Sequence, residues 1–170
     1  MKIKKTLKII LGLIVFLTLP SALFFGYLYV KYDEDLPVGK VGVEADALAN
    51  KMMDALNHDA YDSTNYIEWT HRNKRHYEWQ KSKNVCTVYW KEYKVILNLK
   101  AYESSKAYVH NFEVKGEQAK KLTDQAVVYF NNDSFWLSAP YKVFDKGTIR
   151  QLVKDKNNQD ALLVTYTTGG

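Results

Sequence analysis

The sequence predicts an α+β protein with an N-terminal transmembrane helix, followed by a curved, half-barrel-like antiparallel β-sheet packed on one or two helices. The first supporting observation is an uncharged apolar run near the N-terminus. The second is a series of short aromatic and β-branched segments separated by polar turns, which is typical of antiparallel strands. The third is the order helix, strands, helix, strands, which lacks the regular alternation of a doubly wound fold.

The apolar run covers residues 9–30 and contains no charged side chain. At 1.5 Å per residue it is about 33 Å long as a helix, which matches a bilayer hydrocarbon core of roughly 30 Å. Lysines precede the run and acidic residues follow it: Lys2, Lys4, Lys5 and Lys8, then Asp33, Glu34 and Asp35. The positive-inside rule therefore places the N-terminus in the cytoplasm.

This pattern predicts a single-pass protein of the inner (cytoplasmic) membrane whose domain is periplasmic or extracellular. Residues 1–8 are then a cytoplasmic basic flank, residues 9–30 the transmembrane helix, residues 31–42 a linker and residues 43–170 the extracytoplasmic domain. A cleaved secretory signal is the alternative, but its apolar stretch is normally about 7 to 15 residues long and ends at an A-x-A-like site. Both interpretations export the domain.

The net charge of +5 comes from the flank of the membrane helix. Four of the 24 Lys and Arg residues precede the apolar run, whereas all 19 Asp and Glu residues follow it. The exported domain is therefore nearly neutral. Its charge gives no support to a nucleic-acid partner, and the membrane is the partner that the composition predicts.

The elements of the domain follow from the spacing of apolar residues. Helical spacing over residues 43–57 predicts an amphipathic helix, and residues 116–132 predict a second helix that ends at Asn131 and Asn132. Seven segments are predicted as strands: residues 66–70, 77–80, 85–90, 93–100, 107–114, 148–153 and 161–167. Residues 133–140 are expected to form a turn after the second helix.

No catalytic or metal-binding pattern supports an enzyme, and no cofactor is expected. Cys86 is the only cysteine and lies in an alternating segment, which favours a small buried strand residue over a reactive thiol. His71 and His76 are five residues apart without a carboxylate between them, so their spacing does not match a zinc-binding helix. The sequence also lacks the G-x-S-x-G motif of a serine nucleophile.

The basic segment 71–76 is the sharpest local feature of the sequence. Arg72, Lys74 and Arg75 are flanked by aromatic residues, and this combination can contact a lipid headgroup or another anion. The alternative is a solvated turn between two strands whose aromatic residues pack inward.

Large apolar side chains supply the candidate ligand site. A curved sheet with a helix across its mouth can enclose an apolar cavity, and aromatic residues and leucines are common in the walls of such cavities. The candidates for ligand contact are Trp69, Tyr77, Trp79, Trp90, Leu97, Phe112 and Trp136. Packing of the same side chains in a solid core is the alternative.

Two segments of the chain resemble a set of uncharacterised bacterial envelope proteins: residues 132–148, NDSFWLSAPYKVFDKGT, and residues 162–166, LLVTY. Their architecture is similar to the half-barrels of the periplasmic lipoprotein carriers. The resemblance implies a domain that binds or carries a lipid or lipoprotein chain. Those relatives continue beyond Gly169 and Gly170 with further strands, so the resemblance also implies a C-terminally incomplete sheet that a protein partner completes.

The function expected from these observations is noncatalytic binding of a lipid or other apolar ligand in the cell envelope. A tether of residues 9–30 departs from the soluble carriers and argues against shuttling across the envelope. The first alternative is a structural or protein-interaction module without a ligand cavity. The second alternative is an envelope hydrolase.

Overall fold

The computed structural model describes residues 2–33 and 35–167 of the chain, with side chains from residue 6 onward. It divides into two compact units, one ending at Val38 and one beginning at Gly39. The side chains of Lys2, Lys4 and Lys5 lie outside the described residues. So do Glu34 and residues 168–170, where the sequence predicts the end of the domain.

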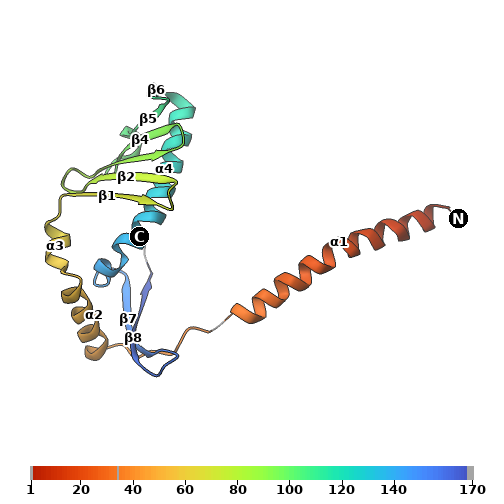
Figure 1. Ribbon diagram of the computed structural model, residues 1–170, viewed down its shortest axis with the longest axis horizontal. Helices are drawn as coiled ribbons and strands as arrows, with labels where there is room; N and C mark the ends of the chain where they lie inside the picture. The colour runs from red at the N-terminus through yellow and green to blue at the C-terminus, as the bar shows by residue number, and fades with distance from the viewer. Residues whose placement is uncertain (1, 34, 168–170) are drawn as a thin grey trace. The chain divides into compact units, whose positions relative to one another are not determined.

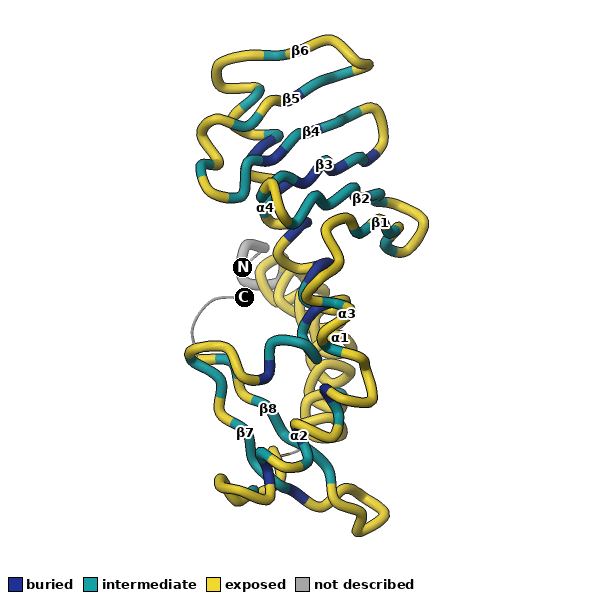
Figure 2. The backbone as a smooth tube through the Cα atoms, turned by 90° about the vertical axis from the view of Figure 1, so that its left-hand side faces the viewer, coloured by how far each residue is buried: buried dark blue, intermediate teal, exposed yellow. Residues whose placement is uncertain are grey.

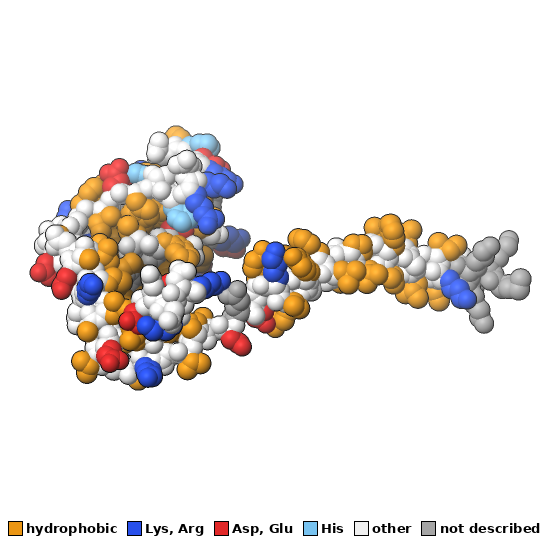
Figure 3. All heavy atoms as spheres, turned by 60° about the horizontal axis from the view of Figure 1, so that its bottom comes forward, with side chains coloured by type: hydrophobic (Ala, Val, Ile, Leu, Met, Phe, Trp, Pro, Cys, Tyr) orange, Lys and Arg blue, Asp and Glu red, His pale blue; other side chains and the backbone are white. Residues whose placement is uncertain are grey.

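The first unit is dominated by the helix α1, Lys2–Tyr32. Its segment Thr6–Tyr32 is long and apolar enough to cross a membrane, and among the described residues it is the one helix with these properties. Figure 3 shows hydrophobic side chains along the length of this helix. The prediction of a long N-terminal apolar helix is confirmed. A membrane anchor and a signal sequence share these properties.

The second unit contains a six-stranded antiparallel sheet in which each strand pairs with the next along the chain (Figure 1). Its strands are β1 (Tyr66–His71), β2 (Arg75–Gln80), β3 (Val85–Trp90), β4 (Tyr93–Asn98), β5 (Lys106–Val109) and β6 (Phe112–Val114). The predicted antiparallel α+β architecture is therefore confirmed. β1 and β6 form the two edges of this sheet.

The segment 107–114 forms two strands where the sequence predicted one. His110 and Asn111 both have positive φ angles, 47° and 69°, and they connect β5 to β6. A two-residue turn with both φ angles positive matches the twist of antiparallel strands, and Asn adopts this conformation readily. The single-strand prediction was wrong because it overlooked this turn.

The helix α4, Gly116–Ser138, covers one face of the sheet. Its start agrees with the prediction, but it continues past the expected stop at Asn131 and Asn132. The predicted turn at residues 133–140 is therefore wrong. Asp133 and Ser134 are buried, so tertiary contacts of the last two turns outweigh the local preference of Asn for a helix end.

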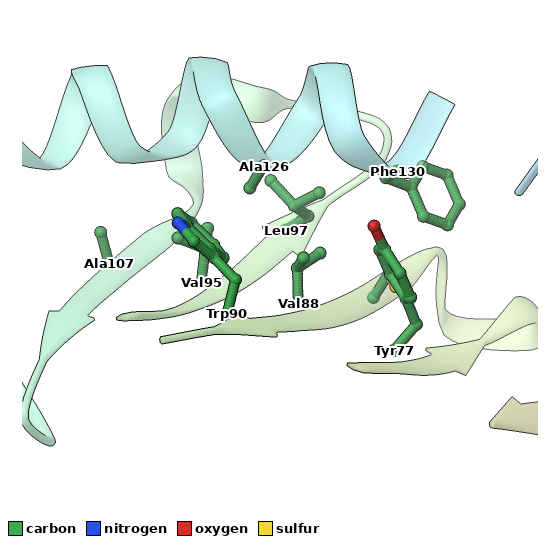
Figure 4. Packing of buried hydrophobic residues seen from close by; sticks show 9 residues of the cluster. Tyr77, Val88, Trp90, Val95, Leu97, Ala107, Ala126 and Phe130 are labelled. Carbon is green, nitrogen blue, oxygen red and sulfur yellow. The ribbon is translucent and has the colours of Figure 1, made fainter. Parts of the chain in front are cut away.

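The main hydrophobic core lies between α4 and the sheet (Figure 4). Its centre is a row of side chains that face one another across successive strands and are fully buried: Tyr77, Val88, Val95 and Ala107. Ala126 and Phe130 of α4 pack onto this face. Figure 2 shows the buried segments of β3 and β4, and Cys86 is buried in β3 as predicted.

A second, smaller core holds the remaining elements together. The strands β7 (Thr148–Lys154) and β8 (Asp160–Tyr166) form a separate antiparallel hairpin, which packs on the helix α2, Val43–Ala55. Ala49 and Met53 of α2 contact Val143 of the segment before the hairpin. The first helix of the domain thus packs on the hairpin, and α4 is the helix that covers the larger sheet. A short helix, α3 (His58–Ser63), was not predicted.

The start of the second unit is fixed to the hairpin by backbone hydrogen bonds. Lys40 N–H donates to the Leu152 carbonyl (3.0 Å), and Leu152 N–H donates to the Lys40 carbonyl (2.8 Å). Gly39 lies so close to β7 that a Cβ atom there would be 2.6 Å from Gln151 Cβ and 2.7 Å from Val153 Cγ1. Only a residue without a side chain fits at this position.

We expect Gly39→Val to destabilise the second unit by about 1 to 3 kcal/mol, because overpacking forces the neighbouring backbone to shift. The measurement is urea unfolding of the full chain in detergent, monitored by tryptophan fluorescence. Val38→Ala is the matched control, since Val38 is fully exposed and exposed substitutions change stability by less than about 0.5 kcal/mol. Equal stability of the two variants would contradict the close approach of Gly39 to β7.

Candidate functional site

Five of the predicted ligand residues gather on the sheet face beneath α4. Trp90 and Leu97 are buried there, and Trp69 stacks on Tyr77 with ring centroids 4.4 Å apart. Trp79 meets Phe130 of α4 edge-on at 5.4 Å. The side chains of this cluster contact one another, so the centre of the interface between α4 and the sheet is a packed core.

The other two predicted residues lie apart from this cluster. Phe112 in β6 is 77% exposed, and Trp136 in α4 is 72% exposed. The structure therefore does not bring Phe112 or Trp136 together with the five residues of the core.

Open space is found along one flank of α4. The smaller of two hollows has a volume of about 220 Å³. It is lined by Trp79, Leu99, Tyr102, Phe130, Asn131, Ser134, Phe135, Ser138 and Lys142. Aromatic and apolar side chains form most of this wall, and the two serines and Asn131 supply polar groups.

The larger hollow has a volume of about 460 Å³ and lies nearer the start of α4. Its walls come from α4, from β5 and β6, and from the short 3-10 helix η2, Tyr102–Ser104. Val114, Ala119 and Tyr102 provide apolar surface. Charged side chains of both signs also line it: Glu103, Lys106, Glu113, Lys115, Lys120 and Asp124.

The two hollows share a helix face and a wall. Six of their α4 residues recur at intervals of three, four or seven: Gly116, Ala119, Thr123, Phe130, Ser134 and Ser138. This spacing places them on one side of a helix. Tyr102 lines both hollows. We call the two hollows together the flank groove; Ala119 and Ser134 within it are about 22 Å apart along the helix axis.

Two tryptophans next to this region have unpaired polar atoms. The indole nitrogens of Trp69 and Trp79 are buried and have no hydrogen-bond partner among the described residues. A buried indole N–H normally finds an acceptor. Trp79 also lines the smaller hollow, but its indole nitrogen is buried and is not accessible from that space.

A buried carboxylate fixes α4 to the sheet. Asp133 is 1% exposed, and its Oδ2 accepts hydrogen bonds from Arg75 Nε (2.6 Å) and from the Tyr77 hydroxyl (2.6 Å). Its Oδ1 accepts from Arg75 (3.1 Å) and from the Asn132 amide (2.9 Å), and His71 Nε2 lies 3.6 Å away. A carboxylate is therefore paired bidentately with an arginine inside the domain, which is a strong geometry.

The electrostatics of this pair favour the ionised carboxylate. Burial raises the pKa of Asp133, but hydrogen bonds from Arg75, Tyr77 and Asn132 lower it, and the net pKa is below the usual value. Burial and the bond to Asp133 raise the pKa of the Tyr77 hydroxyl, so Tyr77 remains a donor. The pairing of Asp133 with Arg75 and Tyr77 has a structural role, because its hydrogen-bond donors and acceptors are used within the protein.

The basic residues of the segment 71–76 have different environments in the structure. Arg75 is held by Asp133, and its guanidinium lies over the ring of Tyr129 at 4.5 Å. Arg72 and Lys74 are exposed in the turn between β1 and β2. Of the three predicted headgroup contacts, Arg72 and Lys74 are therefore the ones exposed to an outside ligand.

Sequence reasoning placed Asp133 in a turn and missed its role as the partner of Arg75. The available signal was an acidic residue three positions after Phe130 on the apolar side of a helix, since buried acids are nearly always paired. Cys86, in contrast, behaves as predicted for a structural residue: burial raises the pKa of its thiol to about 12, which leaves it protonated near neutral pH.

No protein-family model matches the chain, and no curated protein or solved structure is detectably similar to it. The resemblance to envelope proteins with a lipoprotein-carrier-like half-barrel therefore stays a prediction.

We expect Asp133→Asn to lower the free energy of unfolding by about 3 to 5 kcal/mol, because it leaves the partly buried Arg75 without its counter-charge. Urea unfolding of the full chain in detergent measures this effect. Asp124→Asn on the same helix is the matched control: its pair with Lys120 is exposed, and such pairs contribute about 0 to 1 kcal/mol.

The same variant gives a pH test. Because the pKa of Asp133 is lowered on folding, its stabilisation is complete above the unfolded pKa of about 3.9 and is lost as the pH falls through the folded pKa. The stability difference between the parent and Asp133→Asn should thus be constant above about pH 5 and shrink in more acidic solution. A difference that grows on acidification would contradict the assignment.

Proposed function

We propose that this protein is a membrane-anchored envelope protein that binds a lipid or another elongated apolar molecule, without catalysis, in the flank groove. The observation that carries this proposal is the succession of two hollows along one face of α4, both of which are lined by Tyr102. The location differs from the one expected from the sequence, because the centre of the sheet face is filled by the core.

The size of the groove suits an acyl chain. One chain crosses half of a hydrocarbon core of roughly 30 Å, or about 15 Å, and the two hollows are distributed over about 22 Å of α4. The larger hollow, at about 460 Å³, is within the usual range of about 300 to 1,000 Å³ for ligand pockets. The smaller hollow supplies an aromatic end formed by Trp79, Phe130 and Phe135.

The charges of the groove suit a polar headgroup at the larger hollow. Lys106 and Lys115 are exposed there, and Glu103 and Glu113 line the same space. A wall with both signs of charge complements a zwitterionic or neutral polar group better than a strongly anionic one. Arg72 and Lys74 remain the predicted contacts for headgroups outside the groove.

The anchor completes the proposal. We infer that α1 is retained as a single-pass helix with its N-terminus in the cytoplasm, which places the second unit in the periplasm or outside the cell. Lys8 precedes the apolar run, and Asp33 and Asp35 follow it, in agreement with the positive-inside rule. Tyr27, Tyr29 and Tyr32 lie at the end of α1, where aromatic rings suit the headgroup layer.

The half-barrel is also part of the proposal. In it, the six-stranded sheet curves around α4, and the β7–β8 hairpin is a separate sheet that packs on α2. The antiparallel pairing throughout and the long helix on one face of the sheet support this arrangement.

A structural or protein-interaction module is the second candidate. The observation that favours it is the filled core beneath α4, where Val88, Val95 and Leu97 are fully buried. Occupancy of the flank groove separates the two candidates.

Native mass spectrometry of the full chain after gentle extraction tests the proposal. We expect a bound amphiphile at a stoichiometry near one, and we expect Asn131→Trp to reduce its occupancy at least about tenfold, a change of about 1.4 kcal/mol. Asn131 is an exposed residue on the rim of the smaller hollow, so an indole there fills space needed by the ligand.

Val128→Trp is the matched control, because Val128 is also exposed on α4 but lines neither hollow. Its occupancy should equal that of the parent. A parent protein that carries no amphiphile, or a loss of occupancy that is the same in both variants, would count against the flank groove as a lipid site.

A further inference from the structure

The outer edge of β8 carries backbone groups that no described residue pairs. Thr167 N–H donates to the Gly147 carbonyl and Asp155 N–H donates to the Gln159 carbonyl, so the odd-numbered residues of β8 direct their backbone groups toward β7. The even-numbered residues then direct theirs away from β7. Leu162 and Val164 therefore present two N–H and two C=O groups at the free edge.

The other edges of the domain are protected in ways that the edge of β8 is not. The outer edge of β7 pairs with Lys40, and β6 is only three residues long. β1 carries the charged Glu68 at its centre. β8 extends over seven residues, and its segment from Ala161 to Tyr166 has no charge and no proline. A long, uncharged edge of this kind is a template for another strand.

We propose that β8 pairs antiparallel with β8 of a second copy of the chain, about a two-fold axis at Leu163, so that two hairpins form one four-stranded sheet. This interface is separate from the flank groove and goes beyond the proposed function. A two-fold contact uses the same surface on both copies, and the sequence of β8 is self-complementary in this register.

The side chains agree with this register. Leu162 lies opposite Val164 of the second copy, and Ala161 lies opposite Thr165, which are apolar and β-branched pairs of the kind that stabilise antiparallel strands. Asp160 lies opposite Tyr166, so no like charges meet. All seven residues are paired, and Leu162 and Val164 form hydrogen-bonded pairs through the groups that point outward. Anchoring both copies in one membrane raises their effective concentration.

Disulfide trapping of the full chain in membranes tests the register. Odd-numbered residues form the non-hydrogen-bonded pairs of the new interface, with Cα atoms about 4.5 Å apart, a distance that a disulfide spans. We expect Leu163→Cys to form covalent dimers under mild oxidation at least tenfold more than Ala161→Cys. Ala161 is a matched control, because it lies on the same face of β8 and is half-buried like Leu163. In the proposed interface it lies opposite Thr165 of the second copy, whereas Leu163 lies opposite Leu163.

The double variant Ala161→Cys/Thr165→Cys provides a second test that leaves Leu163 intact. It should form dimers, whereas Thr165→Cys alone should not. The parent chain controls for Cys86, which is buried. If Leu163→Cys dimerises no more than Ala161→Cys and the double variant stays monomeric, the second copy is not the occupant of this edge. Slow maleimide labelling of that monomeric Leu163→Cys would then show that a different segment covers β8.

Discussion

The pairing of Asp133 with Arg75 and Tyr77 is the constraint on which the rest of the domain depends. It joins the last turns of α4 to β2, residues more than fifty positions apart in the chain, through hydrogen bonds of 2.6 Å. A buried charge tolerates little displacement, because separation leaves the carboxylate of Asp133 without water and without its partner. The pairing therefore fixes the position of α4 on the sheet near the C-terminal end of the helix, where the smaller hollow lies.

The position of α4 determines what the domain can bind. Its inner face, with Ala126 and Phe130, completes the core, so no ligand enters the centre of the sheet. Its flank leaves space on either side of Tyr102, with aromatic walls at one end and charged side chains at the other. An amphiphile with one long chain matches this division, and an anchored domain would meet such molecules at the membrane surface.

The sequence predicted the architecture well where local patterns determine it. The strand at residues 85–90 agrees exactly in extent, because alternation and a clear turn signal coincide there. Local patterns did not predict the split between β5 and β6, which depends on His110 as well as Asn111. They also did not predict the last turns of α4, which depend on the burial of Asp133. Five of the seven predicted ligand residues lie together, but they form a core. The hollows beside α4 depend on how the helix packs on the sheet, and the spacing of apolar residues in the sequence does not determine that packing.

The most direct test of the account is photo-crosslinking of the full chain in membranes with a diazirine-labelled fatty acyl lipid, with the modified residues mapped by mass spectrometry. The account predicts labels on Tyr102 and on the Ser134–Phe135 turn of α4, and their loss when unlabelled lipid competes. Labels confined to α1, or spread over the surface of the second unit without competition, would contradict it.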